Sequence, residues 1–235
     1  MKIIHEKLKD NDLFLQYTTK PQMESSIKTF SNPNIFTSEV YVITYNNTVI
    51  VIDPWFYDWD FKEYLTKLWK VDSILLTHGH WDHIRCVDKI VEDYPNADVY
   101  IHHFDKELLT NTELNCSFLV WREAIEIKSD ANFIEQWNYD FWELPTQVIH
   151  VPWHTDWCVM YYFEKLSALF LWDTVMGDSI WTLRTPTWDI NKMQASLWKF
   201  KHLWIDFSTL CYPWHWEAMT YWEILRINPF LNWNF

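Results

Sequence analysis

Apolar and polar residues alternate along the chain in two patterns, short strand-like runs and longer helix-like periods. The run VYVITYNNTVIVID, residues 40–53, is rich in β-branched residues on both sides of Asn46-Asn47, which predicts two strands joined by a tight turn. The following segment, DFKEYLTKLW, has the apolar spacing of an amphipathic helix. Further strands are predicted in ADVYIHH, TQVIHVP and STLCYP, a hairpin in CVMYYFEKLSALFLWD, and helices over 191–203 and 218–227. This mixture of strands and helices indicates an α/β fold.

A cluster of polar residues ends the short apolar strand DSILLTH, residues 72–78. The stretch THGHWDHI presents four potential metal ligands within six residues: His78, His80, Asp82 and His83. The segment beyond it, RCVDKIVEDY, has a helical period, so the cluster lies on a strand-to-helix loop. Imidazole and carboxylate groups suit zinc, and also iron or manganese. One catalytic metal with an open coordination position needs fewer ligands than these, so the sequence predicts a site for two metals.

Together with three later stretches, this cluster resembles the metallo-β-lactamase-fold hydrolases, and among them the hydroxyacylglutathione hydrolase (glyoxalase II)-like branch. In that family the H-x-H-x-D-H loop is followed by PGHT, GDT and PGHG. Here these stretches read VPWHTDW, LFLWDTVMGDSIW and YPWHWE, while the early DPG turn reads DPW and the closing NPFL is unchanged. The resemblance extends over nearly all of the chain from about Val40 onward. It implies an α/β fold of the metallo-β-lactamase type, an αββα four-layer sandwich, with residues 1–235 as a single domain.

The resemblance also implies a ligand set and a chemistry. The implied ligands fall into three groups: His78, His80 and His154 for a first metal, Asp82, His83 and His215 for a second, and Asp173 as the bridge between them. Two divalent ions, zinc or alternatively iron or manganese, would share a hydroxide that attacks an activated acyl carbon. Asp82 would also orient this hydroxide as a catalytic residue. The expected partner is a small acyl substrate, a thioester similar to hydroxyacylglutathione, and Arg184 is a candidate contact for an anionic part of it.

Three alternative functions remain open on the sequence alone, two enzymatic and one non-catalytic. A lactone or β-lactam hydrolase would use the same hydroxide, since fold does not determine substrate. A persulfide dioxygenase of the same fold would use one iron, held by two histidines and an aspartate. A non-catalytic binding module would use tryptophans as stacking platforms for sugars or bases. Metal content separates the oxygenase from the hydrolase, because the oxygenase needs one iron and the hydrolase two ions.

Charge and composition narrow the expected partners and location. The net charge of -13 disfavours nucleic acid and anionic membrane surfaces, because binding to either relies on lysine and arginine. No apolar run is long enough for a signal peptide or a membrane span. The four cysteines are widely spaced without a C-x-x-C pair, which fits reduced thiols. We therefore expect a cytoplasmic protein, and the sequence does not indicate its oligomeric state.

Tryptophan and glycine occur in an unusual proportion. The chain has 2 glycines and 18 tryptophans, whereas ordinary usage would give about 16 glycines. Tryptophan stands where the family has glycine in turns beside ligands, at Trp55, Trp153, Trp157, Trp172, Trp214 and Trp216. Others lie beside aspartate or asparagine or at expected helix ends, where glycine commonly supplies a positive φ: Trp59, Trp69, Trp142, Trp188 and Trp233.

Such replacements are costly. A side chain in a left-handed turn costs about 1–2 kcal/mol, and a dozen such sites would exceed the roughly 5–15 kcal/mol by which a domain is stable. Some bacterial lineages read the codon UGA as glycine, and translating UGA as tryptophan would write tryptophan at each such glycine. Our hypothesis is that the cellular protein carries glycine at most of these positions, with Trp81 as an exception. It predicts tryptophans that are strained or point outward at turns beside an ordinary set of ligands.

Overall fold

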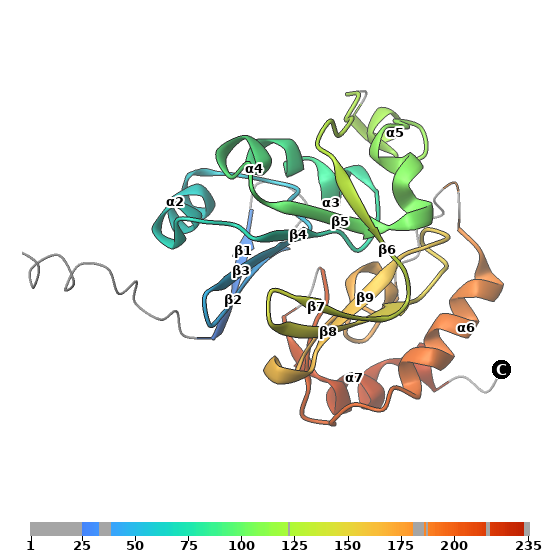
Figure 1. Cartoon of the computed structure of the whole chain (residues 1–235). Coiled ribbons are helices and arrows are strands. Elements are labelled where there is room, and N and C mark those ends of the chain that lie inside the picture. The colour runs from blue at the N-terminus through green and yellow to red at the C-terminus, as the bar shows by residue number, and fades with distance from the viewer. Residues whose placement is uncertain are drawn as a thin grey trace, which may run out of the picture.

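The computed structural model describes residues 25–32, 39–121, 123–180, 186, 188–214 and 217–232 (Figure 1). Within these residues the strands form two six-stranded sheets. The first has the order β1-β2-β3-β4-β5-β6, in which β1 to β3 are antiparallel neighbours and β3 to β6 are parallel. Its strands are β1 (Ser26–Ser31), β2 (Glu39–Tyr45), β3 (Thr48–Ile52), β4 (Ser73–Leu75), β5 (Asp98–His102) and β6 (Ala131–Ile134).

The second sheet has the order β12-β11-β10-β9-β8-β7. All neighbouring pairs in it are antiparallel except β10 and β11, which are parallel. Its strands are β7 (Asn138–Phe141), β8 (Leu144–His150), β9 (Val159–Phe163), β10 (Ala168–Phe170), β11 (Leu210–Tyr212) and β12 (Met219–Thr220).

Helical segments connect these strands and cover the outer faces of the sheets (Figure 1). Those of the first half are α2 (Trp59–Leu68), α3 (Trp81–Ile84), α4 (Val87–Asp93), the 3-10 helix η1 (His103–Leu109) and α5 (Ser117–Trp121). Those of the second half are α6 (Ile190–Lys201), α7 (Tyr221–Ile227) and the 3-10 helices η2 (Glu164–Leu166), η3 (Trp172–Thr174) and η4 (Pro229–Leu231). No helix in the described part of the chain is long and apolar enough to cross a membrane.

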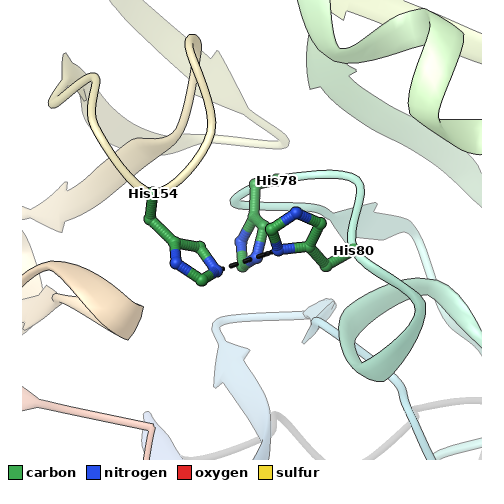
Figure 2. Close-up of side chains that lie close together, drawn as sticks. All are labelled: His78, His80 and His154. Carbon is green, nitrogen blue, oxygen red and sulfur yellow. Dashed lines mark hydrogen bonds between the residues drawn. The ribbon is translucent and has the colours of Figure 1, made fainter. Parts of the chain in front are cut away.

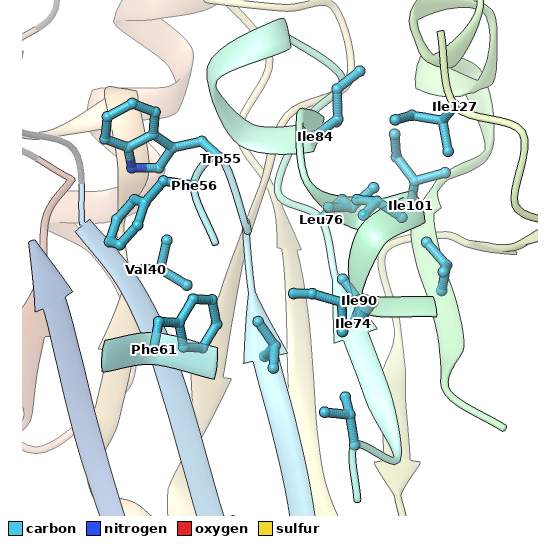
Figure 3. Close-up of a cluster of buried hydrophobic side chains, with 14 of the residues drawn as sticks. Val40, Trp55, Phe56, Phe61, Ile74, Leu76, Ile84, Ile90, Ile101 and Ile127 are labelled. Carbon is cyan, nitrogen blue, oxygen red and sulfur yellow. The ribbon is translucent and has the colours of Figure 1, made fainter. Parts of the chain in front are cut away.

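Three buried apolar clusters show the layering. The first cluster joins the outer face of the first sheet to α2 and α4, and contains Phe61 and Ile90 (Figure 3). The second cluster fills the space between the sheets, and the third joins the second sheet to α6 and α7. Along β2, Val40 and Val42 belong to the first cluster and Tyr41 and Ile43 to the second, as the two-residue period of a strand requires. Three cores between four layers confirm the αββα sandwich.

The segments with the clearest apolar periodicity form the predicted strands and helix. Asn46, with a φ of 53°, forms the turn between the antiparallel strands β2 and β3. The predicted helix after it is α2, which begins where the Asp58 side chain accepts a hydrogen bond from the Phe61 N–H. The hairpin predicted in CVMYYFEKLSALFLWD is β9 and β10. The pattern missed β1, β6, β7 and β12, which are short or largely exposed and so have little apolar periodicity.

Several tryptophans occupy left-handed backbone. Trp69 ends α2 with a φ of 68°, and its N–H donates to the carbonyls of Leu65 and Thr66, an arrangement that favours glycine. Trp142 and Glu143, with φ of 54° and 70°, form the two-residue turn between β7 and β8. The Trp69 and Trp142 side chains are 77% and 50% exposed. The backbone at these turns is therefore one that glycine adopts without strain. The Trp69 indole is mostly exposed, whereas the half-exposed Trp142 indole donates a hydrogen bond to the Ser73 hydroxyl.

Other tryptophans lie inside the protein. Trp55, Trp153, Trp172 and Trp214 are among its largest fully buried side chains, and Trp55 belongs to the first cluster (Figure 3). Trp172 also has a positive φ of 52°. The indole Nε1 atoms of Trp153 and Trp172 have no hydrogen-bond partner among the described residues. A buried donor without a partner costs about 1–3 kcal/mol, so these indoles fit their surroundings poorly.

Candidate metal centre

The predicted ligands come from loops at the ends of three strands. The loop after β4 carries His78 and His80, and α3 begins immediately after it with His83 in its single turn. The loop between β8 and β9 carries His154, and η3 after β10 carries Asp173. Figure 2 shows the His154 ring facing those of His78 and His80 from the opposite loop. The sandwich thus brings residues far apart in the sequence to one edge of the sheets.

Three ring nitrogens converge in the first predicted ligand set. His80 Nδ1 lies 3.0 Å from His78 Nε2 and 2.8 Å from His154 Nε2. Ligands held about 2.0–2.1 Å from one tetrahedral metal are separated from each other by about 3.3 Å. All three imidazoles are buried, and burial lowers the pKa of His78 and His80 well below 6.5, helped by the neighbouring rings. The His78 and His80 rings are therefore neutral and offer lone pairs to a cation.

Asp173 lies between this first set and His83. Its Oδ2 is 2.9 Å from His154 Nε2, 3.8 Å from His78 Nε2 and 3.7 Å from His83 Nε2. Burial works to raise the pKa of Asp173, but His154 and His83 outweigh it and hold that pKa well below its ordinary value. The carboxylate is thus ionised, and it lies between the first predicted ligand set and His83.

His83 is oriented by a residue whose role the sequence did not reveal. Its Nδ1 lies 2.6 Å from Asp53 Oδ2, and the buried Asp53 carboxylate also accepts hydrogen bonds from the Thr77 N–H and hydroxyl. Burial opposes a charged His83, but Asp53 and Asp173 together raise its pKa to about 10. With Nδ1 engaged by Asp53, Nε2 faces Asp173. Asp53 and Thr77 each lie at the end of a predicted strand in the sequence. Because β3 and β4 are parallel neighbours, these two residues meet at one edge of the sheet, and that pairing is the clue that could have identified Asp53.

Asp82 lies near the other predicted ligands but outside the groups of closely spaced ligand atoms. It lies in the single turn of α3, where burial raises its pKa to about 6, His83 lowers it and Asp173 raises it. The two groups of described ligand atoms that lie within 4.8 Å of one another are His78, His80 and His154, and Asp53, His78 and His83. Asp82 belongs to neither group, although it is close enough to Asp173 and His83 for their charges to act on it. His215 and Arg184 lie outside the described residues.

The cluster fits divalent cations. Three of its buried atoms, His80 Nε2, His83 Nε2 and Asp173 Oδ1, have no hydrogen-bond partner among the described residues. His83 Nε2 and Asp173 Oδ1 are electron-pair donors when the groups are neutral and ionised respectively, so a cation would satisfy them. A buried set of imidazoles and carboxylates with open donor atoms has the composition of zinc, iron or manganese sites. The residues present therefore suit metal binding.

Comparison with known proteins agrees with this geometry. The sequence matches the Metallo-beta-lactamase superfamily over residues 34–207. The chain belongs to this superfamily. A protein named hydroxyacylglutathione hydrolase from Francisella philomiragia is 32% identical over 184 residues, covering 78% of this chain and 63% of the relative. One of the same name from Francisella tularensis subsp. holarctica is 33% identical over 176 residues, covering 74% and 61%. The chain thus spans less than two thirds of the length of these relatives.

Solved structures of the superfamily share the fold over most of their length. The BLEG-1 B3 metallo-β-lactamase aligns with a TM-score of 0.77 and 25% identity, covering 88% of this chain and all 100% of that one. TTHA1623 in a di-iron-bound form aligns with a TM-score of 0.72 and 25% identity, covering 86% and 99%. These alignments confirm the metallo-β-lactamase fold that the sequence predicted.

Indole rings pack against two of the predicted ligands, His83 and His154. Trp214 stacks on His83 with ring centroids 4.3 Å apart, and Trp172 meets the same ring edge-on at 5.3 Å. Trp153 lies 6.0 Å from the ring of His154, the residue that follows it. Glycine at these three positions would remove the indoles and open space beside His83. The ligand rings would keep the backbone loops and hydrogen bonds that place them.

Proposed function

We propose that this protein is a hydrolase that binds two divalent metal ions and attacks an activated acyl carbon, with a thioester similar to hydroxyacylglutathione as its substrate. The observation that carries the proposal is the convergence of His78 Nε2, His80 Nδ1 and His154 Nε2, with Asp173 Oδ2 between them and His83. One set of ligands on each side of a carboxylate is the arrangement that a two-metal hydrolase needs. The names of the Francisella relatives support the thioester.

The proposed ligand groups are the three predicted from the sequence. His78, His80 and His154 would hold the first ion, Asp82, His83 and His215 would hold the second, and Asp173 would contact both. When bound, the ions supply a hydroxide near neutral pH and polarise the acyl carbonyl, so that no serine or cysteine nucleophile is needed. Zinc, iron and manganese all suit this set of nitrogen and oxygen donors.

The protein residues position the reacting groups. Asp53 accepts a hydrogen bond from His83 Nδ1–H and so keeps Nε2 directed at Asp173. Asp82, in the first turn of α3, orients the attacking water by accepting one of its hydrogen bonds. Arg184 contacts an anionic part of the substrate.

Elemental analysis combined with a substrate panel tests this function. The purified protein is expected to contain two zinc, iron or manganese ions per chain and to hydrolyse thioesters in preference to lactones, β-lactams and persulfides. One iron per chain with oxygen-dependent persulfide turnover would instead establish an oxygenase. Preferential turnover of lactones or β-lactams would keep the metal chemistry and refute the thioester substrate. A protein that binds no metal would refute the proposal as a whole.

A further inference from the structure

Asp105 lies outside both ligand sets but touches the two loops that carry the first set. It lies on η1, directly after β5, and its side chain is buried. One of its oxygens, Oδ2, accepts hydrogen bonds from the Gly79 N–H at 3.2 Å and from the Thr155 hydroxyl at 3.0 Å. Gly79 separates His78 from His80, and Thr155 follows His154. A single carboxylate oxygen thus joins the loop after β4 to the loop between β8 and β9.

The contact between η1 and the first of these loops is unusually close. A Cβ atom added to Gly79 would lie 2.4 Å from Leu108 Cβ and 3.2 Å from the Asp105 carbonyl oxygen. The first distance is far shorter than a carbon–carbon contact allows. Gly79 is one of only 2 glycines in the chain. The loop can therefore lie against η1, within reach of the Asp105 carboxylate, only because residue 79 has no side chain.

The Asp105 carboxylate has no cationic partner to explain its burial. None of the ion pairs in the described part of the chain includes it. Burial raises the pKa of Asp105 to about 7, although the hydrogen bonds from Thr155 and Gly79 lower it. A buried carboxyl group without a cation costs folding free energy. Its two hydrogen bonds to ligand-bearing loops are the interactions that offset this cost.

We propose that Asp105 is a positioning residue for the first metal, holding the two loops together so that the nitrogens of His78, His80 and His154 converge. This inference rests on the proposed metal binding by those three residues. Asp105 is not expected to touch the metal or the substrate, since its bonds are to Gly79 and Thr155. Its role is to fix the separation of the two loops from the side of η1, in addition to the direct contact between the His80 and His154 rings.

Zinc titration of the metal-free protein tests this role without relying on activity. Zn²⁺ would be added in competition with a chromophoric chelator, so that the affinity of each bound equivalent is measured. Asp105→Ala is expected to weaken one of two equivalents by about 10–100-fold, the usual effect of losing a group that orients a ligand. Asp105→Asn keeps an oxygen that can accept both hydrogen bonds and should restore most of that affinity.

Asp88 provides a matched control. Its carboxylate also holds a loop, accepting hydrogen bonds from the Lys128 N–H and from the N–H and hydroxyl of Ser129, but this loop carries no ligand. Asp88→Ala should lower thermal stability and leave both zinc affinities unchanged. If Asp105→Ala fails to fold, Thr155→Val removes only one of the two bonds and should still weaken one equivalent, with Thr155→Ser restoring it.

The outcomes separate this inference from the proposed function. Wild-type protein that binds two zinc equivalents, with Asp105→Ala or Thr155→Val binding both as tightly, would overturn the positioning role and leave the hydrolase intact. Equal weakening in Asp105→Ala and Asp88→Ala would also overturn it, because the effect would then be general loss of stability. Wild-type protein that binds no zinc, iron or manganese would overturn the proposed function, and this inference with it.

Discussion

The ligands and the turns beside them differ in how well their side chains suit the backbone. His78, His80 and His154 are buried with their nitrogens directed at one another. Trp69 and Trp172, by contrast, have positive φ, and the Trp172 indole is buried without a hydrogen-bond partner among the described residues. Both groups of residues lie within the same metallo-β-lactamase fold. The comparison fits the hypothesis that the cellular protein has glycine at these turns and histidine at the predicted ligand positions.

The largest expected effect is that of restoring glycine throughout. We predict that the gene has UGA codons at the proposed glycine positions, and that a chain with glycine there expresses as a soluble metalloprotein. The chain with tryptophan should fold poorly, because each left-handed tryptophan costs about 1–2 kcal/mol and each overpacked one about 1–3 kcal/mol. Sequencing the gene and comparing soluble yield and metal content of the two chains provide the measurement.

The codons alone can contradict this explanation. UGG at Trp153, Trp172 and Trp214 would show that tryptophan is encoded at the turns beside the ligands. Equal soluble yield of both chains would show that the strained turns are tolerated. Trp81 serves as the internal control, since it lies within α3 at an ordinary helical φ and should have a UGG codon.

The second effect tests the ligand side of the comparison. Asp82→Ala should lower thioester hydrolysis by about 10²–10⁴-fold, the range for losing a group that handles the proton of the nucleophile. Much of the fold should remain, because the buried His78, His80, His83, His154 and Asp173 still converge. Steady-state kinetics on protein of verified metal content measures it, with circular dichroism for the fold. His202→Ala, which changes an exposed histidine at the end of α6, should be neutral. Full turnover by metal-loaded Asp82→Ala would refute the assigned role.

A smaller effect is expected at Asp53, which orients a ligand without being one of the predicted set. Asp53→Asn keeps the shape but weakens the hydrogen bond that holds His83 Nδ1, so affinity for one metal equivalent should fall by about 10–100-fold. The measurement is the competition titration with Zn²⁺. Asp93→Asn is the control, because Asp93 is an α4 residue paired with Lys62 and Tyr57 away from the ligands. Unchanged affinity in Asp53→Asn would contradict the orienting role assigned to Asp53.

The sequence predicted the parts of the site that are local and missed those that depend on contacts between strands. The cluster THGHWDHI could be assigned to a strand-to-helix loop because its ligands are adjacent in the chain. Asp53 and Asp105 could not be assigned, because their partners Thr77, His83, Gly79 and Thr155 lie 24 to 50 residues away. The resemblance to a family supplied the order of His154 and Asp173, which spacing alone does not give.

The same division applies to the fold. The hairpin of β2 and β3 has a dense β-branched pattern and a turn at Asn46, so both strands were found. Strand β1 pairs along the edge of the sheet with mostly exposed residues, and β12 has two residues. Such strands are stabilised by pairing with a neighbour rather than by a buried face of their own. Their existence therefore follows from the sheet and not from their own sequence.

The smallest effect isolates a single turn. Trp69→Gly should raise the free energy of unfolding by about 1 kcal/mol, since it relieves a left-handed backbone and removes only an exposed indole at the end of α2. Trp198 is also exposed but lies in the interior of α6, so Trp198→Gly should lower that free energy by about 0.5 kcal/mol through helix propensity. Chemical denaturation of the three proteins measures both values. Opposite signs would tie the strain to the positive φ of Trp69, whereas a loss of stability in both variants would show that the tryptophan is accommodated at this helix end.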